Sequence, residues 1–334
     1  MTQRLDEWLL TRPESDFPTS AGIPHRTRLG AVGQYLQKEI HPHVEKGAML
    51  RGDGYLTDHG REHIDTVIRR ASELLGPVPG ELTTYEAYLL VMAIHFHDVA
   101  NIFGRAEHEK RAGDIMREIG RLMGDDSVEV RTIQQIARAH GGHVDGDRDT
   151  ITQLPFSEYV LGAHVRIQLL AALLRFADEL ADDSSRAARF PLEHNQIPAS
   201  SEIFHAYARS LHTVAIDPHS RTIELRFDLY KPDAIRRFGK GKKRAYLLDE
   251  IYSRTLKMHT ERIYCSRFLV PVVRIDAINV RVSVYVSENQ VTPDREIGYS
   301  LQERGYPVSP KTLSELCPSI EWTGRALRTA LLRD

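Results

Sequence analysis

The chain has 334 residues, enough for one large domain or two ordinary ones, and its 41% hydrophobic and 27% charged residues are typical of globular proteins. Its longest apolar runs, 88–94 and 169–174, are too short to cross a bilayer, which excludes a membrane-spanning helix. The formal net charge of -2 excludes general attraction of nucleic acid.

The first half of the chain has the pattern of helices joined by short breaks. Residues 1–28 contain three prolines among scattered polar residues, and we expect a loosely ordered lead-in there. Beyond it, apolar residues recur at helical spacing, and glycine or proline marks most of the ends. The predicted helices span residues 29–40, 62–75, 85–98, 107–123, 126–140 and 160–180.

The pattern changes after about residue 210. Alternating apolar residues predict strands at 213–216, 222–227 and 270–286, and a helix is expected over 245–264. The tail, 294–334, has a helical pattern with Pro and Gly breaks. The predicted fold class is therefore mainly α, with a lead-in at 1–28, a helical domain at 29–200 and a smaller α+β domain at 201–334.

Several predicted helices place a histidine or a carboxylate among their apolar residues. His63, His97, Asp98, His140 and Asp178 each lie one helical turn from an apolar residue of their own helix. One such histidine alone is usually an ordinary core residue. A carboxylate there must be neutralised or hydrogen-bonded, however, because an unpaired buried charge is costly. A single shared cation accounts for all of these residues together.

The chemistry of the residues narrows the choice of cation. Mixed imidazole and carboxylate ligands favour Mn, Fe, Ni, Co or Zn over Mg alone, with one or two ions bound. Four protein ligands leave positions open for water and for a phosphate oxygen, and an activated water is what hydrolysis needs.

The order of these residues resembles the HD superfamily of metal-dependent phosphohydrolases. The matching stretches are DHGREHI at 58–64, IHFHDVAN at 94–101 and LLRFADEL at 173–180, and the resemblance covers roughly residues 50–190. It implies a helical fold in which His63 is the first histidine ligand, His97 and Asp98 form the doublet, and Asp178 is the closing aspartate.

The resemblance also implies a second group of residues. His108 and His140 fall where many members carry two further histidines, and with them the set looks like a two-metal site bridged by Asp98. A surface histidine at 108 and a core or helix-end histidine at 140 are the alternatives. Many relatives have lysine where this chain has Asn101, so we expect Arg105 to contact the phosphate instead. Asp98 and Arg105 are the predicted catalytic residues.

Three more residues are assigned to substrate binding. His59 lies on the same face as His63, either supporting it or replacing it as a ligand, and His143 follows His140 closely. Arg186 would lie on the face of Asp178 if that helix continued, although a solvated helix end explains it equally well.

The sequence departs from several branches of the superfamily. No GYP triplet follows the doublet, which disfavours the cyclic-di-GMP phosphodiesterases, and no helicase or synthetase segment is fused to the chain. The combination of motifs looks closest to bacterial conflict-system HD proteins with a C-terminal extension.

A basic segment lies in the predicted C-terminal domain. Six of the nine residues from 236 to 244 are basic, namely Arg236, Arg237, Lys240, Lys242, Lys243 and Arg244. A flexible loop of this kind can bind phosphates or a nucleic-acid backbone, although a solvated loop is the commoner case. The sparse aromatic residues around it do not predict base stacking.

The main functional prediction is hydrolysis of a nucleotide-type phosphomonoester or phosphodiester by a metal-activated water. One alternative is a single-strand nuclease of the same fold, and another is a nucleotide sensor without catalysis that signals through its C-terminal domain. That domain could also contact a protein partner or a second copy of the chain. The two cysteines, Cys265 and Cys317, form no disulfide framework, and the N-terminus has no secretory pattern, so we expect a cytoplasmic protein.

Overall fold

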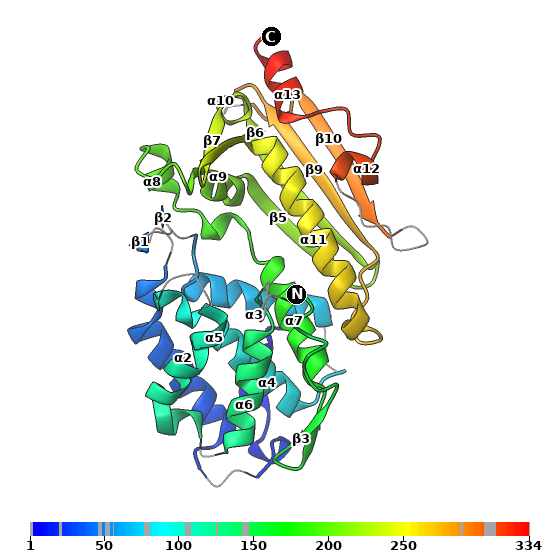
Figure 1. The fold of residues 1–334 in the computed structure, drawn as a ribbon. Helices are drawn as coiled ribbons and strands as arrows, with labels where there is room; N and C mark the ends of the chain where they lie inside the picture. Colours follow the sequence, from blue (N-terminus) through cyan, green and yellow to red (C-terminus); the bar gives the residue numbers. More distant parts are fainter. Residues whose placement is uncertain are drawn as a thin grey trace.

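The computed structural model describes residues 3–19, 22–45, 49–50, 54–55, 57–76, 81–103, 108–124, 126–141, 147–287, 290–303 and 312–333. The first half of the chain forms a bundle of helices, and the second half forms a sheet with a long helix across it (Figure 1). The predicted fold class, mainly α with a helical part followed by an α+β part, is confirmed.

The bundle is built around α4, which packs against α1, α2, α3, α6 and α7. Because α4 is apolar on all sides, it is buried on all sides. A capping box between Thr83 and Glu86 fixes where it begins. The helices of the bundle are α1 (Leu5–Thr11), α2 (His25–Glu39), α3 (Arg61–Leu75), α4 (Thr84–Phe96), α5 (His108–Ile119), α6 (Ser127–Arg138) and α7 (Ile167–Glu179), with short 3-10 turns at Glu14–Asp16, His41–His43, Val99–Phe103 and Gly120–Met123.

Residues 1–28 were expected to form a loosely ordered lead-in, but they contain α1 and the start of α2. Leu5 and Leu9 of α1 are spaced one turn apart and are both buried. His25 and Arg28 at the start of α2 are also buried, and both contact the fully buried carboxylate of Glu129 on α6. The prolines lie between these helices rather than in an unfolded stretch.

The helix predicted over 160–180 is shorter, because its first residues form a hairpin. Strands β3 (Glu158–Val160) and β4 (Ala163–Val165) pair across a turn at Leu161 and Gly162, where both residues have positive φ. Apolar residues recur through both the hairpin and α7, and periodicity alone does not separate a short strand from a buried helix segment.

The second half contains a four-stranded sheet of order β10-β9-β6-β5. Its strands are β5 (Leu211–Asp217), β6 (Thr222–Tyr230), β9 (Ala277–Tyr285) and β10 (Arg295–Gln302), and only the central pair, β6 and β9, is parallel. Helix α11 (Leu247–Leu269) connects that pair and lies along one face of the sheet (Figure 1). Residues 294–334 were expected to form a helical tail. The first of them instead form β10, where Ile297, Tyr299 and Leu301 alternate toward the buried face.

The basic segment, residues 236–244, is not the flexible loop that we expected. It forms a hairpin of β7 (Arg237–Lys240) and β8 (Lys243–Tyr246). Arg236 pairs with Glu202, and Lys240 pairs with Glu250 of α11. The remaining elements are the short strands β1 (Met49–Leu50) and β2 (Gly54–Tyr55), a 3-10 turn at Ser184–Arg186, and the helices α8 (Arg189–Glu193), α9 (Glu202–Ser210), α10 (Lys231–Ile235), α12 (Leu313–Leu316) and α13 (Gly324–Leu331).

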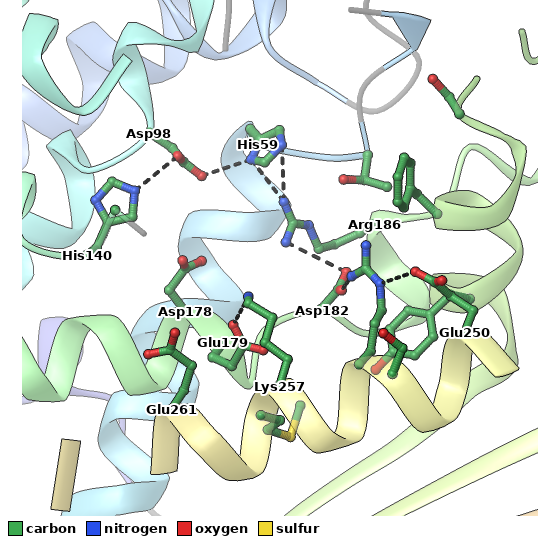
Figure 2. Close-up of a pocket in the computed structure, with 18 of the residues that line it drawn as sticks. His59, Asp98, His140, Asp178, Glu179, Asp182, Arg186, Glu250, Lys257 and Glu261 are labelled. Carbon is green, nitrogen blue, oxygen red and sulfur yellow. Dashed lines mark hydrogen bonds and ion pairs between the residues drawn. The ribbon is translucent and has the colours of Figure 1, made fainter. Parts of the chain in front are cut away.

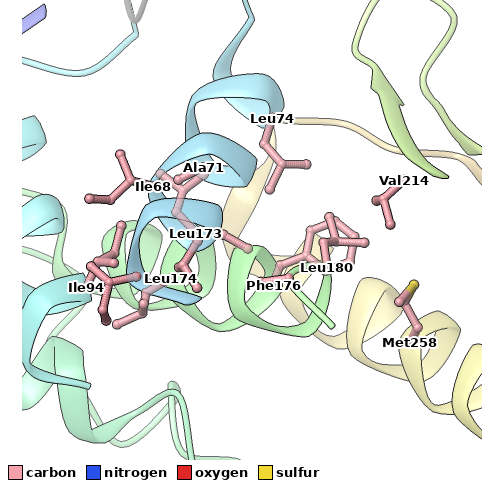
Figure 3. Close-up of a cluster of buried hydrophobic side chains, with 14 of the residues drawn as sticks. Ile68, Ala71, Leu74, Ile94, Leu173, Leu174, Phe176, Leu180, Val214 and Met258 are labelled. Carbon is pink, nitrogen blue, oxygen red and sulfur yellow. The ribbon is translucent and has the colours of Figure 1, made fainter. Parts of the chain in front are cut away.

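The apolar core runs without interruption from the bundle into the sheet-containing part. Leu74 of α3 and Leu180, just after α7, face Val214 of β5 and Met258 of α11 (Figure 3). The domain boundary near residue 200 stays a prediction, but the two parts share one core. Among the described helices, none is long and apolar enough to cross a membrane.

Candidate metal centre

Four residues from three regions of the bundle meet at one point. His63 comes from the first turn of α3, His97 and Asp98 from the residues just after α4, and Asp178 from the last turn of α7. One ligand atom from each lies within 4.8 Å of every other, an arrangement that could hold a metal ion. These are the four ligands expected from the sequence. His97 and Asp98 lie past the end of α4 rather than inside the helix predicted over 85–98.

The short distances in this cluster join the two imidazoles to each other and to the carboxylate oxygens. His63 Nε2 lies 3.2 Å from His97 Nε2 and 3.2 Å from Asp178 Oδ1. Asp98 Oδ2 lies 3.3 Å from both imidazole nitrogens. Both histidine side chains are fully buried, while the Asp178 side chain is 25% exposed and faces the cavity described below. The centre is therefore open on the side of Asp178.

Backbone carbonyls fix the orientation of two histidine rings. His97 Nδ1 donates a hydrogen bond of 2.7 Å to the carbonyl of Ile94. His140 Nδ1 donates in the same way to the carbonyl of Ala137, at 2.5 Å. A carbonyl can only accept, so each ring carries its proton on Nδ1 and turns Nε2 toward the carboxylates. Histidine ligands of metals are commonly held in this way.

The two oxygens of Asp98 face different groups. Oδ2 faces His63, His97 and His59, while Oδ1 accepts a 3.0 Å hydrogen bond from Asn101 Nδ2. His140 Nε2 lies 3.5 Å from Oδ1. From the sequence we noted only that Asn101 stands where many relatives have lysine. The structure gives Asn101 a role of its own, because it orients Asp98.

The electrostatics of the cluster favour a bound cation. Burial opposes the charged form of His97, but the attraction of Asp98 and Asp178 prevails and raises its pKa to about 10. Burial also opposes ionisation of Asp178, yet hydrogen bonds from His63 and His97 hold its pKa well below the ordinary value. A buried and a partly buried carboxylate at this point favour positive charge between them, and the donor set of two imidazoles and two carboxylates fits a divalent metal.

His59 and Arg186 lie beside this cluster and not in it. His59 Nδ1 is 2.8 Å from Asp98 Oδ2, and the Arg186 guanidinium is 2.9 Å from the same ring. Arg186 also donates to the carbonyl of Asp58, whose carboxylate accepts from the backbone N–H of His63 and so fixes the start of α3. Arg186 reaches the site from a 3-10 turn. The helix does not continue to Arg186, because α7 ends at Glu179, and the buried Arg186 is not a solvated helix end either.

The other predicted residues have different outcomes. Arg105 and His143 lie outside the described residues, and His108 is the first residue of α5 with a side chain that lies outside the description. His95, two residues before His97, lies beside Gly33 of α2 and is not in the cluster.

A cavity of about 580 Å³ opens in front of the metal cluster. Asp98, His140 and Asp178 line one end, and Glu250 lines the other (Figure 2). Lys240, which pairs with Glu250, is also part of the lining. The wall opposite the cluster is α11, which belongs to the part of the chain with the sheet. The basic hairpin was expected to lie in a separate domain from the ligands, but Lys240 lines their cavity.

Three ion pairs join α7 to α11 along this cavity. Arg175 binds Glu261 at 2.7 Å, Glu179 binds Lys257 at 2.5 Å, and Asp182, just beyond α7, binds Arg254. The α7 partners follow one another by four and then three residues, and the α11 partners do the same in the opposite direction. We call these three pairs the α7–α11 ladder.

The ladder was missed by the sequence analysis. Charged residues at helical spacing on α11 have the pattern of a solvated face, and nothing in that pattern marks them as partners of α7. A signal was present in the matching spacing of opposite charges on the two helices, although it becomes specific only once the helices are known to be antiparallel neighbours.

The comparison with known protein families agrees with this geometry. The chain matches the HD-CE family over residues 53–257, which is more than half of its length. It therefore belongs to the HD-CE family, within the HD superfamily. The match runs from the segment before α3 through the ladder residues Arg254 and Lys257, so it covers the four cluster residues and the first half of α11, and Glu261 lies beyond it. No curated protein matches the chain by sequence.

Proposed function

We propose that this protein is a metal-dependent phosphohydrolase that acts on a nucleotide-type phosphomonoester or phosphodiester. The observation that carries the proposal is the convergence of His63, His97, Asp98 and Asp178 at the end of a cavity, in a chain of the HD superfamily. These four residues would hold a divalent ion such as Mn, Fe, Ni, Co or Zn. When bound, such an ion lowers the pKa of water and neutralises charge on phosphoryl oxygens.

The chain's own residues have separate tasks in this proposal. Asn101 holds the Asp98 carboxylate in place, and the carbonyl of Ile94 holds the His97 ring. Arg186, anchored on Asp58, presents a guanidinium at the cavity wall, where it would bind a substrate phosphate. His59, which lies between Arg186 and Asp98, would keep these two charges in a fixed relation.

A second metal ion is supported by the geometry around Asp98 Oδ1, the oxygen that also accepts from Asn101 Nδ2. The Oδ1 atom and His140 Nε2 face each other across 3.5 Å, away from the first group of ligands. His140 would serve that second ion with Asp98 as a shared ligand, and the resemblance adds His108 as its partner. Arg105 and His143 remain proposed substrate contacts on the resemblance alone.

The shape of the cavity favours a small nucleotide over a polymer. Its volume of about 580 Å³ lies in the range of small-molecule sites. The half-buried rings of Tyr55 and Phe204 line it, and such rings offer an apolar surface to a base or a sugar. In the basic hairpin, Arg236 and Lys240 are already paired with carboxylates.

A hydrolysis screen tests the proposal. Purified protein is incubated with nucleotides, cyclic nucleotides and single-stranded nucleic acids, each with Mn²⁺, Ni²⁺, Co²⁺ or Mg²⁺. We expect metal-dependent release of a product from a mononucleotide, abolished in Asp178→Ala and retained in Asp276→Ala, a half-exposed aspartate. Product release at equal rates by wild type and Asp178→Ala would contradict the proposal, and nucleotide binding without any hydrolysis would favour the sensor.

The nuclease alternative has its own test. Neutralising Arg236, Arg237, Lys242, Lys243 and Arg244 leaves the cavity intact, because none of these five residues lines it. A small-nucleotide hydrolase should keep its turnover in this variant. A nuclease that uses the hairpin should instead bind single strands weakly and with a shallower dependence on salt.

A further inference from the structure

Lys257 of α11 stands out among the cations of the cavity because it is the most exposed of them. Its side chain is 63% exposed, compared with 40% for Lys240, 29% for Arg254, 9% for Arg186 and 6% for Arg175. The three arginines are held in place by the groups around them. Lys257 therefore presents its charge to whatever enters the cavity.

Lys257 is also tied to the metal-binding helix. Its Nζ donates to Glu179 Oε2 at 2.5 Å, and Glu179 is the residue next to Asp178 in α7 (Figure 2). An ammonium group has three N–H donors, so an anion can bind Lys257 while the bond to Glu179 is kept. The place where such an anion would lie is beside the open side of the metal cluster.

The charges of the cavity wall support an anion there. Asp98 and Asp178 belong to the metal cluster, and a divalent ion bound there would match their charge. The rest of the lining has four carboxylates, Glu179, Asp182, Glu250 and Glu261, and five cations, Arg175, Arg186, Lys240, Arg254 and Lys257. Five positive and four negative charges leave an excess of one positive charge, which suits a phosphate beyond the one at the metal.

We propose that Lys257 forms a subsite for a second phosphate group, so that the preferred substrate carries at least two phosphates in sequence, as a nucleoside diphosphate or triphosphate does. This inference rests on the proposed function, since it assumes that the first phosphate lies at His63, His97, Asp98 and Asp178. It makes α11, from the second half of the chain, the wall that selects the substrate.

Equilibrium binding of two small probes tests the subsite. Inorganic phosphate has one phosphoryl group, and imidodiphosphate has two and resists hydrolysis. Calorimetry with Mn²⁺-loaded protein should show that Lys257→Gln weakens imidodiphosphate about 10-fold, the loss expected for one charged hydrogen bond, and changes phosphate affinity less than about 2-fold. Lys257→Arg should restore most of the affinity. Lys243→Gln, an exposed hairpin lysine outside the cavity lining, is the matched control and should change neither probe.

The outcomes separate the subsite from the proposed function. Equal affinity of wild type and Lys257→Gln for imidodiphosphate would overturn the subsite, even in a protein that hydrolyses nucleotides. An equal loss for both probes would also overturn it, because Lys257 would then serve the first phosphate. A selective loss for imidodiphosphate in a protein without hydrolytic activity would support the subsite and contradict the phosphohydrolase.

Discussion

The two walls of the cavity are built on different principles. The bundle wall holds its polar side chains at the ends of α4 and α7 and at the start of α3, fully buried except for Asp178. The α11 wall has charges in opposite pairs along a helix surface, and its pairs are partly exposed. Removing one member of the first wall takes away a ligand, whereas removing one member of the second leaves a partner charge without its counterion.

This difference indicates which wall of the proposed enzyme carries out the reaction and which wall selects the substrate. The bundle wall has the rigid, carbonyl-oriented histidines that a metal site requires. The α11 wall has long side chains that can rotate to meet a substrate. The proposed chemistry therefore depends on the first wall and the proposed choice of substrate on the second, and the following variants test that division.

The largest effect is expected from the bundle wall, at His140. His140→Ala should lower turnover more than about 100-fold, because a ligand should matter more than the surrounding groups that typically contribute 10- to 100-fold. Total bound metal should fall by less than turnover does, because the first ion keeps its four ligands. Steady-state rates and elemental analysis of one preparation measure both quantities. Turnover at the wild-type rate would leave only a one-metal site.

In the α11 wall, the expected effect is on stability. Arg254→Met removes the cation that lies between Asp182 and Glu250, whose side chains are 15% and 3% exposed. Lys240 still contacts Glu250, and Arg186 lies 3.7 Å from Asp182, so neither carboxylate is left alone. Losing the two ion pairs of Arg254 should nevertheless lower the free energy of unfolding by about 3 kcal/mol, measured by urea denaturation. The control is Arg281→Met, which breaks a pair of more than half-exposed side chains and should cost less than about 0.5 kcal/mol. Equal losses in both variants would show that the ladder does not join the two parts.

A smaller loss of function is expected at Asn101. Asn101→Ala removes the hydrogen bond to Asp98 Oδ1, and groups that orient a ligand typically contribute about 10- to 100-fold in metal affinity. Competition with a metal-binding dye measures that affinity. Asn279→Ala removes a comparable bond to Glu224 on the sheet and serves as the control. An unchanged affinity in Asn101→Ala would mean that Asp98 is held by its histidine neighbours alone.

The smallest effect is a pH dependence on the side of α11. Burial, aided by repulsion from Arg262, lowers the pKa of His259 to about 4. The unfolded chain takes up the proton near pH 6.5, so stability is present above that pH and is lost as the pH falls toward 4. At pH 5 this one residue should cost about 2 kcal/mol relative to neutral pH.

His259→Met removes the titrating group but keeps an apolar side chain of similar size. The difference in unfolding free energy between pH 7 and pH 5 should shrink by about that amount in the variant, while His41 and the other buried histidines contribute equally to both proteins. Identical pH profiles for wild type and variant would show that His259 is protonated without cost in the folded state.

The cluster residues of the bundle wall could be predicted from the sequence because they are polar residues at helix positions that are otherwise apolar. Histidines and carboxylates at apolar helix positions need an explanation, and their order allowed His63, His97, Asp98 and Asp178 to be assigned before any contact was known. Helix α1, in contrast, was not predicted, because the three prolines give residues 1–28 the composition of a loosely ordered lead-in, although Leu5 and Leu9 bury one face of this helix.

The α11 wall could not be predicted in the same way. The long helix was expected over 245–264, but Lys257 and Glu261 are ordinary residues for a helix surface. Their role depends on the antiparallel packing of α11 on α7, which is a long-range contact. The basic hairpin was mistaken for a flexible loop because Gly239 and Gly241 suggested one, although Gly241 alone supplies the positive φ that the turn requires.

The metal content of the purified protein tests directly whether His63, His97, Asp98 and Asp178 bind a metal ion. Wild type, His97→Ala and Asp178→Ala are loaded with Mn²⁺, passed through a desalting column and analysed for metal by mass spectrometry, with circular dichroism to verify that each is folded. We predict at least one ion per chain in wild type and a large loss in both variants, with Asp276→Ala behaving as wild type. Equal metal content in wild type, His97→Ala and Asp178→Ala would contradict the assignment of the metal centre and the proposed function that depends on it.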